Sequence, residues 1–267
     1  MVAGCGAVHA AAMTAPMTSS KTASTIAPTI VSTTDLHRRY GEGPAAVDAL
    51  AGVSVDIARG AFTAIMGASG SGKSTLMHLM AGLDTPTGGT VRLDGVEIAG
   101  LDDKRLTELR RDRVGFVFQA FNLLPVLTAE ENLVLPLTIA GRKPDAAWLE
   151  SLIDAVGLGD RRTHRPSELS GGQQQRVAVA RALVSKPAVV FADEPTGNLD
   201  SNASAEVLGL LRRAVDEFEQ TVVMVTHDAG AAAYADRLIV LADGRVAHDV
   251  AAGSADEILD VMKAVGP

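Results

Sequence analysis

The chain has 267 residues, 47 % of them hydrophobic, so it is long enough to bury a core as one large domain. Its formal net charge of −8 argues against nucleic acid as the main partner, because phosphate contacts need clustered lysine and arginine. Cys5 is the only cysteine, which excludes an intrachain disulfide and fits a reducing compartment. No stretch approaches the roughly 18 apolar residues of a membrane span, so another chain would have to supply any spans.

The chain begins with a segment of low complexity. Residues 1–31 are rich in Ala, Thr and Ser, carry one charged side chain, Lys21, and show no sustained periodicity. Such a composition predicts a disordered extension, and Met13 and Met17 are alternative starts. A folded domain is expected over residues 32–267.

Structural patterns follow the extension. Residues 53–57 alternate with a period of two, as a half-buried strand does, and residues 61–66 form a short apolar strand. The apolar face of the helix that follows consists of Leu76, Leu79, Met80 and Leu83. Residues 90–98 predict a hairpin, with Asp94 and Gly95 in its tight turn.

The second half of the chain combines a long helical stretch with further strands. Residues 101–113 predict a surface helix, 114–118 a buried strand, and 128–185 look helical throughout. Three later apolar strands are expected at 188–192, 221–226 and 237–241. Because strands alternate with helices, the expected fold is α/β: a mainly parallel sheet with helices on both faces, interrupted by a helical insert over about residues 120–185.

A glycine-rich loop joins the strand at 61–66 to its helix. It reads Gly-Ala-Ser-Gly-Ser-Gly-Lys-Ser-Thr and fits the full pattern of a nucleoside-triphosphate loop. Its glycines allow backbone N–H groups to face phosphates, and Lys73 and Ser74 are expected to reach the β- and γ-phosphates and Mg²⁺, respectively. The predicted nucleotide contacts are Gly67, Ala68, Ser69, Gly70, Ser71, Gly72, Lys73, Ser74 and Thr75.

Two acidic residues follow the apolar strand at 189–192. Strand ends beside a phosphate loop are where open α/β sheets bind ligands. Asp193 is therefore expected to hold the Mg²⁺ shell, and Glu194 to orient or deprotonate an attacking water. An isolated Asp-Glu pair would more often be an ordinary solvated turn, so the preceding strand carries this interpretation.

A third motif begins a helix between the other two. Ser170 is a natural N-cap, and Gly171 and Gly172 leave backbone N–H groups accessible ahead of Gln173. These features predict a second anion site, suited to a γ-phosphate. A simple helix start has the same composition, so this motif decides nothing by itself.

Together and in this order, the three motifs resemble the nucleotide-binding subunit of an ABC (ATP-binding cassette) transporter. The resemblance implies a phosphate-loop (RecA-like) α/β fold with an antiparallel β subdomain and an inserted α-helical signature subdomain. It also implies that Ser170–Gln173 of one copy cover the Mg²⁺-ATP bound to the phosphate loop of another. Two copies would then form an ATP-sandwich homodimer that hydrolyses ATP.

The same resemblance assigns three further residues. Tyr40, placed before the first long strands, looks like the aromatic residue that stacks on adenine, although a core or turn tyrosine remains an alternative. Gln119 looks like the Q-loop glutamine, which touches Mg²⁺ or water. His227 looks like the switch histidine at the γ-phosphate, and it joins Glu194 and Lys73 as a catalytic candidate. Residues 196–200 resemble the D-loop, which lies at the dimer interface.

One branch of the family resembles the chain most. Residues 118–125, 168–176 and 193–200 are similar to ATPases of lipoprotein release, macrolide export and cell division. This implies an integral membrane permease of the FtsX/MacB type, docked beside residues 119–125 at the cytoplasmic face of the cell membrane. A soluble ABC ATPase and a cell-division regulator remain alternatives. The sequence indicates no transported substrate.

Overall fold

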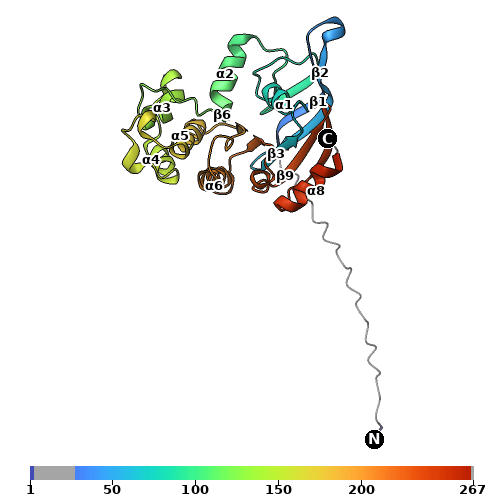
Figure 1. Cartoon of the computed structure of the whole chain (residues 1–267). Coiled ribbons are helices and arrows are strands. Elements are labelled where there is room, and N and C mark those ends of the chain that lie inside the picture. Colours follow the sequence, from blue (N-terminus) through green and yellow to red (C-terminus); the bar gives the residue numbers. More distant parts are fainter. Residues whose placement is uncertain (3–27, 266–267) are drawn as a thin grey trace.

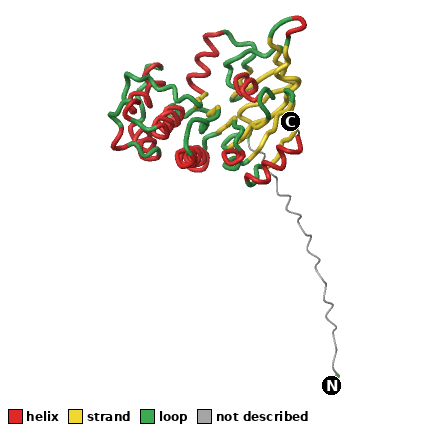
Figure 2. The backbone as a smooth tube through the Cα atoms, viewed as in Figure 1, coloured by secondary structure: helices red, strands yellow, loops and turns green. Residues whose placement is uncertain are grey.

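A computed structural model describes residues 1–2 and 28–265 of the chain (Figure 1). The predicted disordered extension, with the alternative starts Met13 and Met17, lies outside the described residues as far as position 27. Within the described part, one lobe consists of helices and loops, and the other contains the strands (Figure 2). None of these helices combines the length and the apolar character needed to cross a bilayer.

A six-stranded sheet forms the centre of the larger lobe. Its strands, in spatial order, are β10 (Arg245–Ala251), β9 (Arg237–Ala242), β3 (Phe62–Gly67), β8 (Val222–Val225), β7 (Val189–Asp193) and β6 (Val114–Phe118). All neighbouring pairs are parallel except β10 with β9, which confirms the prediction of a mainly parallel sheet. The carboxyl ends of the parallel strands therefore share one edge.

A four-stranded antiparallel sheet packs above it, as the family resemblance implied. Its strands, in spatial order, are β2 (Val47–Ala58), β1 (Thr29–Tyr40), β4 (Gly88–Leu93) and β5 (Val96–Glu97). The strand β1 begins at Thr29 rather than at residue 32, because Ile30 and Val31 are already buried in the core. The predicted hairpin is confirmed, with Asp94 and Gly95 at φ 46° and 79° between β4 and β5.

The described residues contain eight α-helices. They are α1 (Lys73–Met80), α2 (Asp103–Arg113), α3 (Ala129–Ile139), α4 (Ala146–Ala155), α5 (Gly171–Leu183), α6 (Ser201–Phe218), α7 (Ala229–Ala232) and α8 (Ala255–Val265). Helices α3, α4 and α5 form the inserted helical subdomain, which lies to one side of β6 in Figure 1.

Alternate residues of β3 face two separate hydrophobic cores, because successive side chains of a strand point to opposite faces. Phe62 and Met66 belong to the core that includes residues of α3, α4, α5 and α6. Ile65 belongs to the other core, with α1 and the antiparallel sheet. Helix α1 is enclosed here, with Met77 and Met80 fully buried. The strand that leads into the glycine loop is thus held from both faces.

Two sequence expectations are wrong in detail. Helix α1 ends at Met80, and the chain turns at Gly82 with φ 66°, so Leu83 lies beyond the helix and is 44 % exposed. Residues 128–185 are not helical throughout, because the chain leaves α3 and α4 through Gly141 and Gly157, both with positive φ. Two short 3₁₀ turns and loops occupy the space before α5 begins.

Candidate active site

The glycine loop lies at the carboxyl edge of the central sheet, between β3 and α1. Two of its glycines are required sterically. A Cβ on Gly67 would lie 2.3 Å from the Leu241 carbonyl oxygen, and one on Gly72 would lie 2.4 Å from the Ala49 carbonyl oxygen. Gly72 also has φ +100°, a region that favours glycine. The loop is therefore fixed against β9 and β2 in one shape.

Lys73 folds back over this loop. Its Nζ donates hydrogen bonds to the carbonyl oxygens of Gly67 at 3.0 Å and Ala68 at 2.8 Å. Burial lowers the pKa of Lys73, while the nearby carboxylates of Glu194 and Asp193 act in the opposite direction. The ammonium group thus stands between the glycine loop and the acidic strand end, where a bound anion would relieve its desolvation.

Asp193 ends β7 directly beside the glycine loop. Burial raises the pKa of Asp193 and Glu194 raises it further, whereas His78, Lys73 and a contact with the Ser74 hydroxyl lower it. A half-buried carboxylate beside a hydroxyl is a set of hard oxygen donors that fits Mg²⁺. Among residues 28–265, no group of three or more His, Cys, Asp or Glu side chains forms a metal site.

Glu194 and His227 form a polar pair next to Asp193. Glu194 follows β7 in a left-handed conformation with φ 47°, and its backbone N–H donates to the Val225 carbonyl oxygen at 2.9 Å. Its Oε1 lies 2.9 Å from Nδ1 of His227. The carboxylate is largely shielded at 21 % exposure while the imidazole is 75 % exposed. Both border a cavity of about 750 Å³, which Thr196, among others, also lines.

Gln119 is held by the predicted D-loop. Its Nε2 donates to Oδ1 of Asn198 at 3.1 Å, and Nδ2 of Asn198 donates to the Gln119 carbonyl oxygen at 3.1 Å. Because Phe118 pairs with Asp193 between β6 and β7, this amide pair lies beside the acidic strand end. The hydrogen-bond partner of the Gln119 side chain is thus Asn198, and its contact with Mg²⁺ or water remains a prediction.

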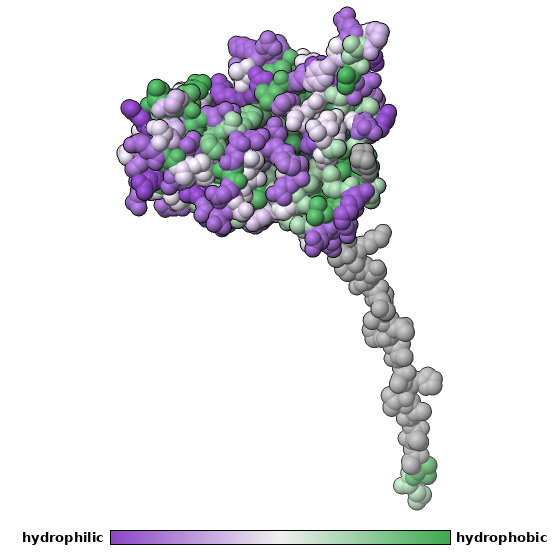
Figure 3. All heavy atoms as spheres, in the orientation of Figure 1, coloured by the Kyte–Doolittle hydropathy of each residue, from purple (hydrophilic) through white to green (hydrophobic). Residues whose placement is uncertain are grey.

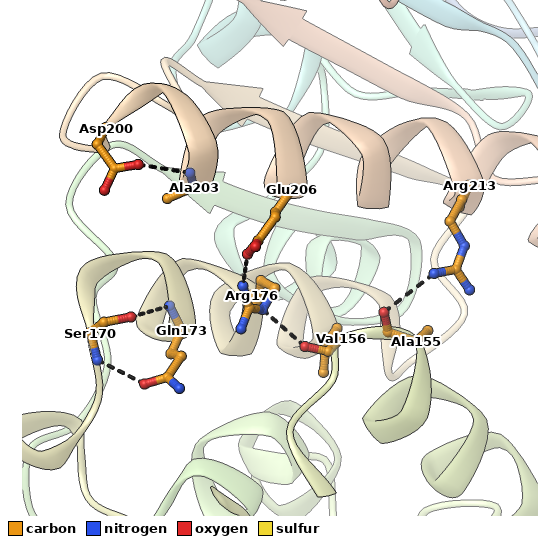
Figure 4. Close-up of polar contacts among 9 residues, drawn as sticks. All are labelled: Ala155, Val156, Ser170, Gln173, Arg176, Asp200, Ala203, Glu206 and Arg213. Atoms are coloured by element: carbon orange, nitrogen blue, oxygen red, sulfur yellow. Dashed lines mark hydrogen bonds and ion pairs between the residues drawn. The ribbon is translucent and has the colours of Figure 1, made fainter.

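The signature residues form the first turn of α5 (Figure 4). The Ser170 hydroxyl accepts a hydrogen bond from the Gln173 backbone N–H at 3.2 Å, and the Gln173 side chain accepts one from the Ser170 N–H at 2.9 Å. This capping box fixes the turn. A Cβ on Gly172 would lie 2.9 Å from Cβ of Ala203, so glycine permits the close approach of α6. The N–H groups of Gly171 and Gly172 have no partner within the helix.

Tyr40 was expected before the first long strands, but it lies at the end of one of them. It is the last residue of β1, which pairs with β2 as far as Tyr40 through several register shifts. Its hydroxyl donates to Oδ2 of Asp84 at 2.7 Å, and the Arg38 guanidinium lies 4.4 Å from the ring centroid. Tyr40 as a whole is 41 % exposed. One ring face therefore has a cation, and stacking of a base on Tyr40 remains a prediction.

The fold brings together only part of the predicted site. Lys73, Asp193, Glu194 and His227 meet at the carboxyl edge of the central sheet. The signature turn at 170–173 starts α5, on the far side of β6 and α6 from α1 (Figure 1). Among the residues that the structure describes, no hydrogen bond joins that turn to the glycine loop. The two predicted phosphate-binding motifs therefore lie apart within one copy.

Sequence reasoning missed two residues that touch this region. Asn198 was recognised only as part of the D-loop, and Gln175 was not singled out. Gln175 lies on the buried side of α5, with Ala178 and Val179 at helical spacing after it. A polar side chain at such a position was the available signal.

Comparison with known proteins agrees with this geometry. The pattern that defines the family described as "ABC transporter" matches residues 50–197, more than half of the chain. The chain belongs to the ABC transporter family. Among solved structures, this ABC ATPase resembles the ATP-binding cassette MJ0796 in a dimeric post-hydrolysis state bound to ADP and Pi, with a TM-score of 0.75 and 41 % identity. That similarity covers 84 % of this chain and all of the solved one.

Two groups of curated relatives match the ABC ATPase. It is 49 % identical over 217 residues to the lipoprotein-releasing system ATP-binding protein LolD of Geobacter metallireducens, covering 80 % of this chain and 96 % of the relative. It is 47 % identical over 224 residues to the macrolide export ATP-binding/permease protein MacB of Marinobacter nauticus, covering 83 % of this chain. The chain spans only about a third (35 %) of that relative's length. Within this family, the chain is therefore similar to both the LolD and the MacB proteins over the residues that align.

Proposed function

We propose that two copies of this chain bind two Mg²⁺-ATP molecules between them and hydrolyse ATP to power a membrane permease of the FtsX/MacB type. The observation that carries the proposal is the separation, within one copy, of the glycine loop from the signature turn at 170–173. A second copy in opposite orientation would join the two halves. The dimeric state named for the MJ0796 cassette supports this arrangement.

The residues of the site have complementary roles in this proposal. The glycine loop binds the phosphates through its N–H groups, and Lys73 exchanges the carbonyl oxygens of Gly67 and Ala68 for phosphate oxygens. Ser74 and Asp193 would hold Mg²⁺, which neutralises phosphate charge when bound. Glu194 orients or deprotonates the attacking water, and the imidazole of His227 fixes the carboxylate of Glu194.

An apolar groove supports the permease part of the proposal. A cavity of about 350 Å³ lies between β6, α2, α3 and α5, and its walls include Phe116, Phe118 and Ile139. Ile139 is 75 % exposed and Val126 is 73 % exposed on the same subdomain. Figure 3 shows apolar side chains at the surface of this subdomain among hydrophilic ones. A permease segment docked here would cover them and hold the ATPase at the cytoplasmic membrane face.

The test of this proposal is the Glu194→Gln variant. It keeps the shape of the side chain but removes the base, so we expect ATP to bind, the dimer to persist and turnover to fall by about a hundred-fold or more. Light scattering with saturating Mg²⁺-ATP measures the dimer, and phosphate release measures turnover. A variant that hydrolyses ATP normally refutes the role of Glu194, and one that stays monomeric, with or without permease, refutes the sandwich.

A further inference from the structure

One buried amide connects the signature helix to both strand ends of the site. The side chain of Gln175 on α5 is fully buried, at 0 % exposure. Its Nε2 donates to the carbonyl oxygens of Phe118 at 3.0 Å and Pro195 at 2.5 Å. Because both neighbours are hydrogen-bond acceptors, the amide must present its nitrogen to them.

The two acceptors are adjacent to proposed site residues. Phe118 ends β6 and precedes Gln119, and Pro195 follows Glu194 at the end of β7. The reciprocal amide pair of Gln119 and Asn198 ties the same two segments together a second time. One side chain of α5 thus bonds to the turn after each of two neighbouring strands.

Packing alone does not explain why residue 175 carries an amide group. Its Oε1 has no hydrogen-bond partner among the residues that the structure describes. Burial of an amide with an unpaired oxygen is unfavourable, and a leucine of similar size would fill the same volume without that penalty. The function of the side chain therefore lies in its two donated bonds.

We propose that Gln175 is a positioning residue for ATP hydrolysis. Gln175 lies four residues after Gly171, so it stands one turn behind the N–H groups that would receive the partner copy's γ-phosphate. Its two hydrogen bonds fix the backbone beside Gln119 and Glu194. Closure of the signature turn on one nucleotide thereby sets the geometry of the hydrolytic residues at the other. This inference rests on the proposed function.

The test compares two variants of Gln175 with a matched control. Gln175→Leu keeps the volume and removes both donated bonds, and Gln175→Glu keeps the shape but donates at most one bond, and only when its carboxyl group is protonated. The control is Asn132→Leu, which removes another fully buried amide, one that binds the Leu124, Leu127 and Thr128 carbonyl oxygens. For each full-length protein, kcat, KM for ATP and the melting temperature are measured.

We expect Gln175→Leu to lower kcat by about ten-fold to a hundred-fold with KM for ATP changed less than about three-fold, because a small misplacement of reacting groups is costly while the glycine loop is intact. Gln175→Glu should recover part of its activity, relative to the wild type at the same pH, as the pH falls and its carboxyl group becomes able to donate one bond. Asn132→Leu should lower the melting temperature without the kcat loss.

Three results would overturn the inference. The first is an unchanged kcat in Gln175→Leu. The second is a kcat loss in Asn132→Leu as large as that in Gln175→Leu when the two variants have the same melting temperature. The third is an activity of Gln175→Glu, relative to the wild type, that does not change with pH. If Gln175→Leu does not fold, the pH profile of Gln175→Glu still decides. Other results would refute the proposed function: no phosphate release by the wild type, or a rate of phosphate release in Glu194→Gln equal to that of the wild type.

Discussion

The glycine loop offers two positions at which one substitution separates two physical effects. A Cβ on Gly72 would lie 2.4 Å from the Ala49 carbonyl oxygen, whereas Gly70, with φ +81°, has open space around it. Gly70→Ala therefore adds backbone strain alone, about 1–2 kcal/mol. Gly72→Ala adds similar strain and also overpacks against backbone that cannot rotate away, about 1–3 kcal/mol more. We expect it to lower the free energy of unfolding by roughly 2–5 kcal/mol.

Urea denaturation of both variants and the wild type measures these losses. Gly72→Ala should unfold at a clearly lower urea midpoint than Gly70→Ala, with an unchanged slope. It should also bind fluorescent ATP more weakly than the wild type, because the loop must move away from β2 to admit the methyl group. Equal destabilisation of the two variants would refute the reasoning that the Ala49 contact fixes the loop.

Two further predictions concern charge and docking. Burial raises the pKa of Asp193, so its ionisation opposes folding above the ordinary aspartate pKa. Asp193→Asn should therefore stabilise the nucleotide-free protein at neutral pH and lose that advantage in acid. The same variant should abolish Mg²⁺-dependent turnover. Thermal unfolding across pH checks the stability prediction, and equal stability at neutral pH would contradict it. Ile139→Asp should leave the ATPase of the isolated chain unchanged but prevent recovery of a permease from detergent-solubilised membranes. Val47→Asp, at a 63 % exposed position on β2, is the control and should retain the permease.

Local patterns predicted most elements correctly. The alternation at 53–57 and the apolar run at 61–66 predicted β2 and β3, because burial on one or both faces leaves its period in the sequence. Asp94 and Gly95 predicted the hairpin because its tight turn requires positive φ, which these two residues adopt readily. The wrong predictions concerned helix ends. Apolar spacing alone extended the helix α1 to Leu83, whereas the turn at Gly82 ends it earlier.

The sequence by itself determined the phosphate chemistry of this protein. The glycine loop with Lys73, the acidic strand end and the capped signature turn each consist of consecutive residues, so each motif is visible in the sequence alone. Only the tertiary structure decided which of them meet. Strand order places Asp193 and Glu194 beside Lys73. The helix α5 directs Gln175 to the ends of β6 and β7, whereas its first turn lies apart from the glycine loop. These relations join residues distant along the chain, and packing of sheet and helices sets them.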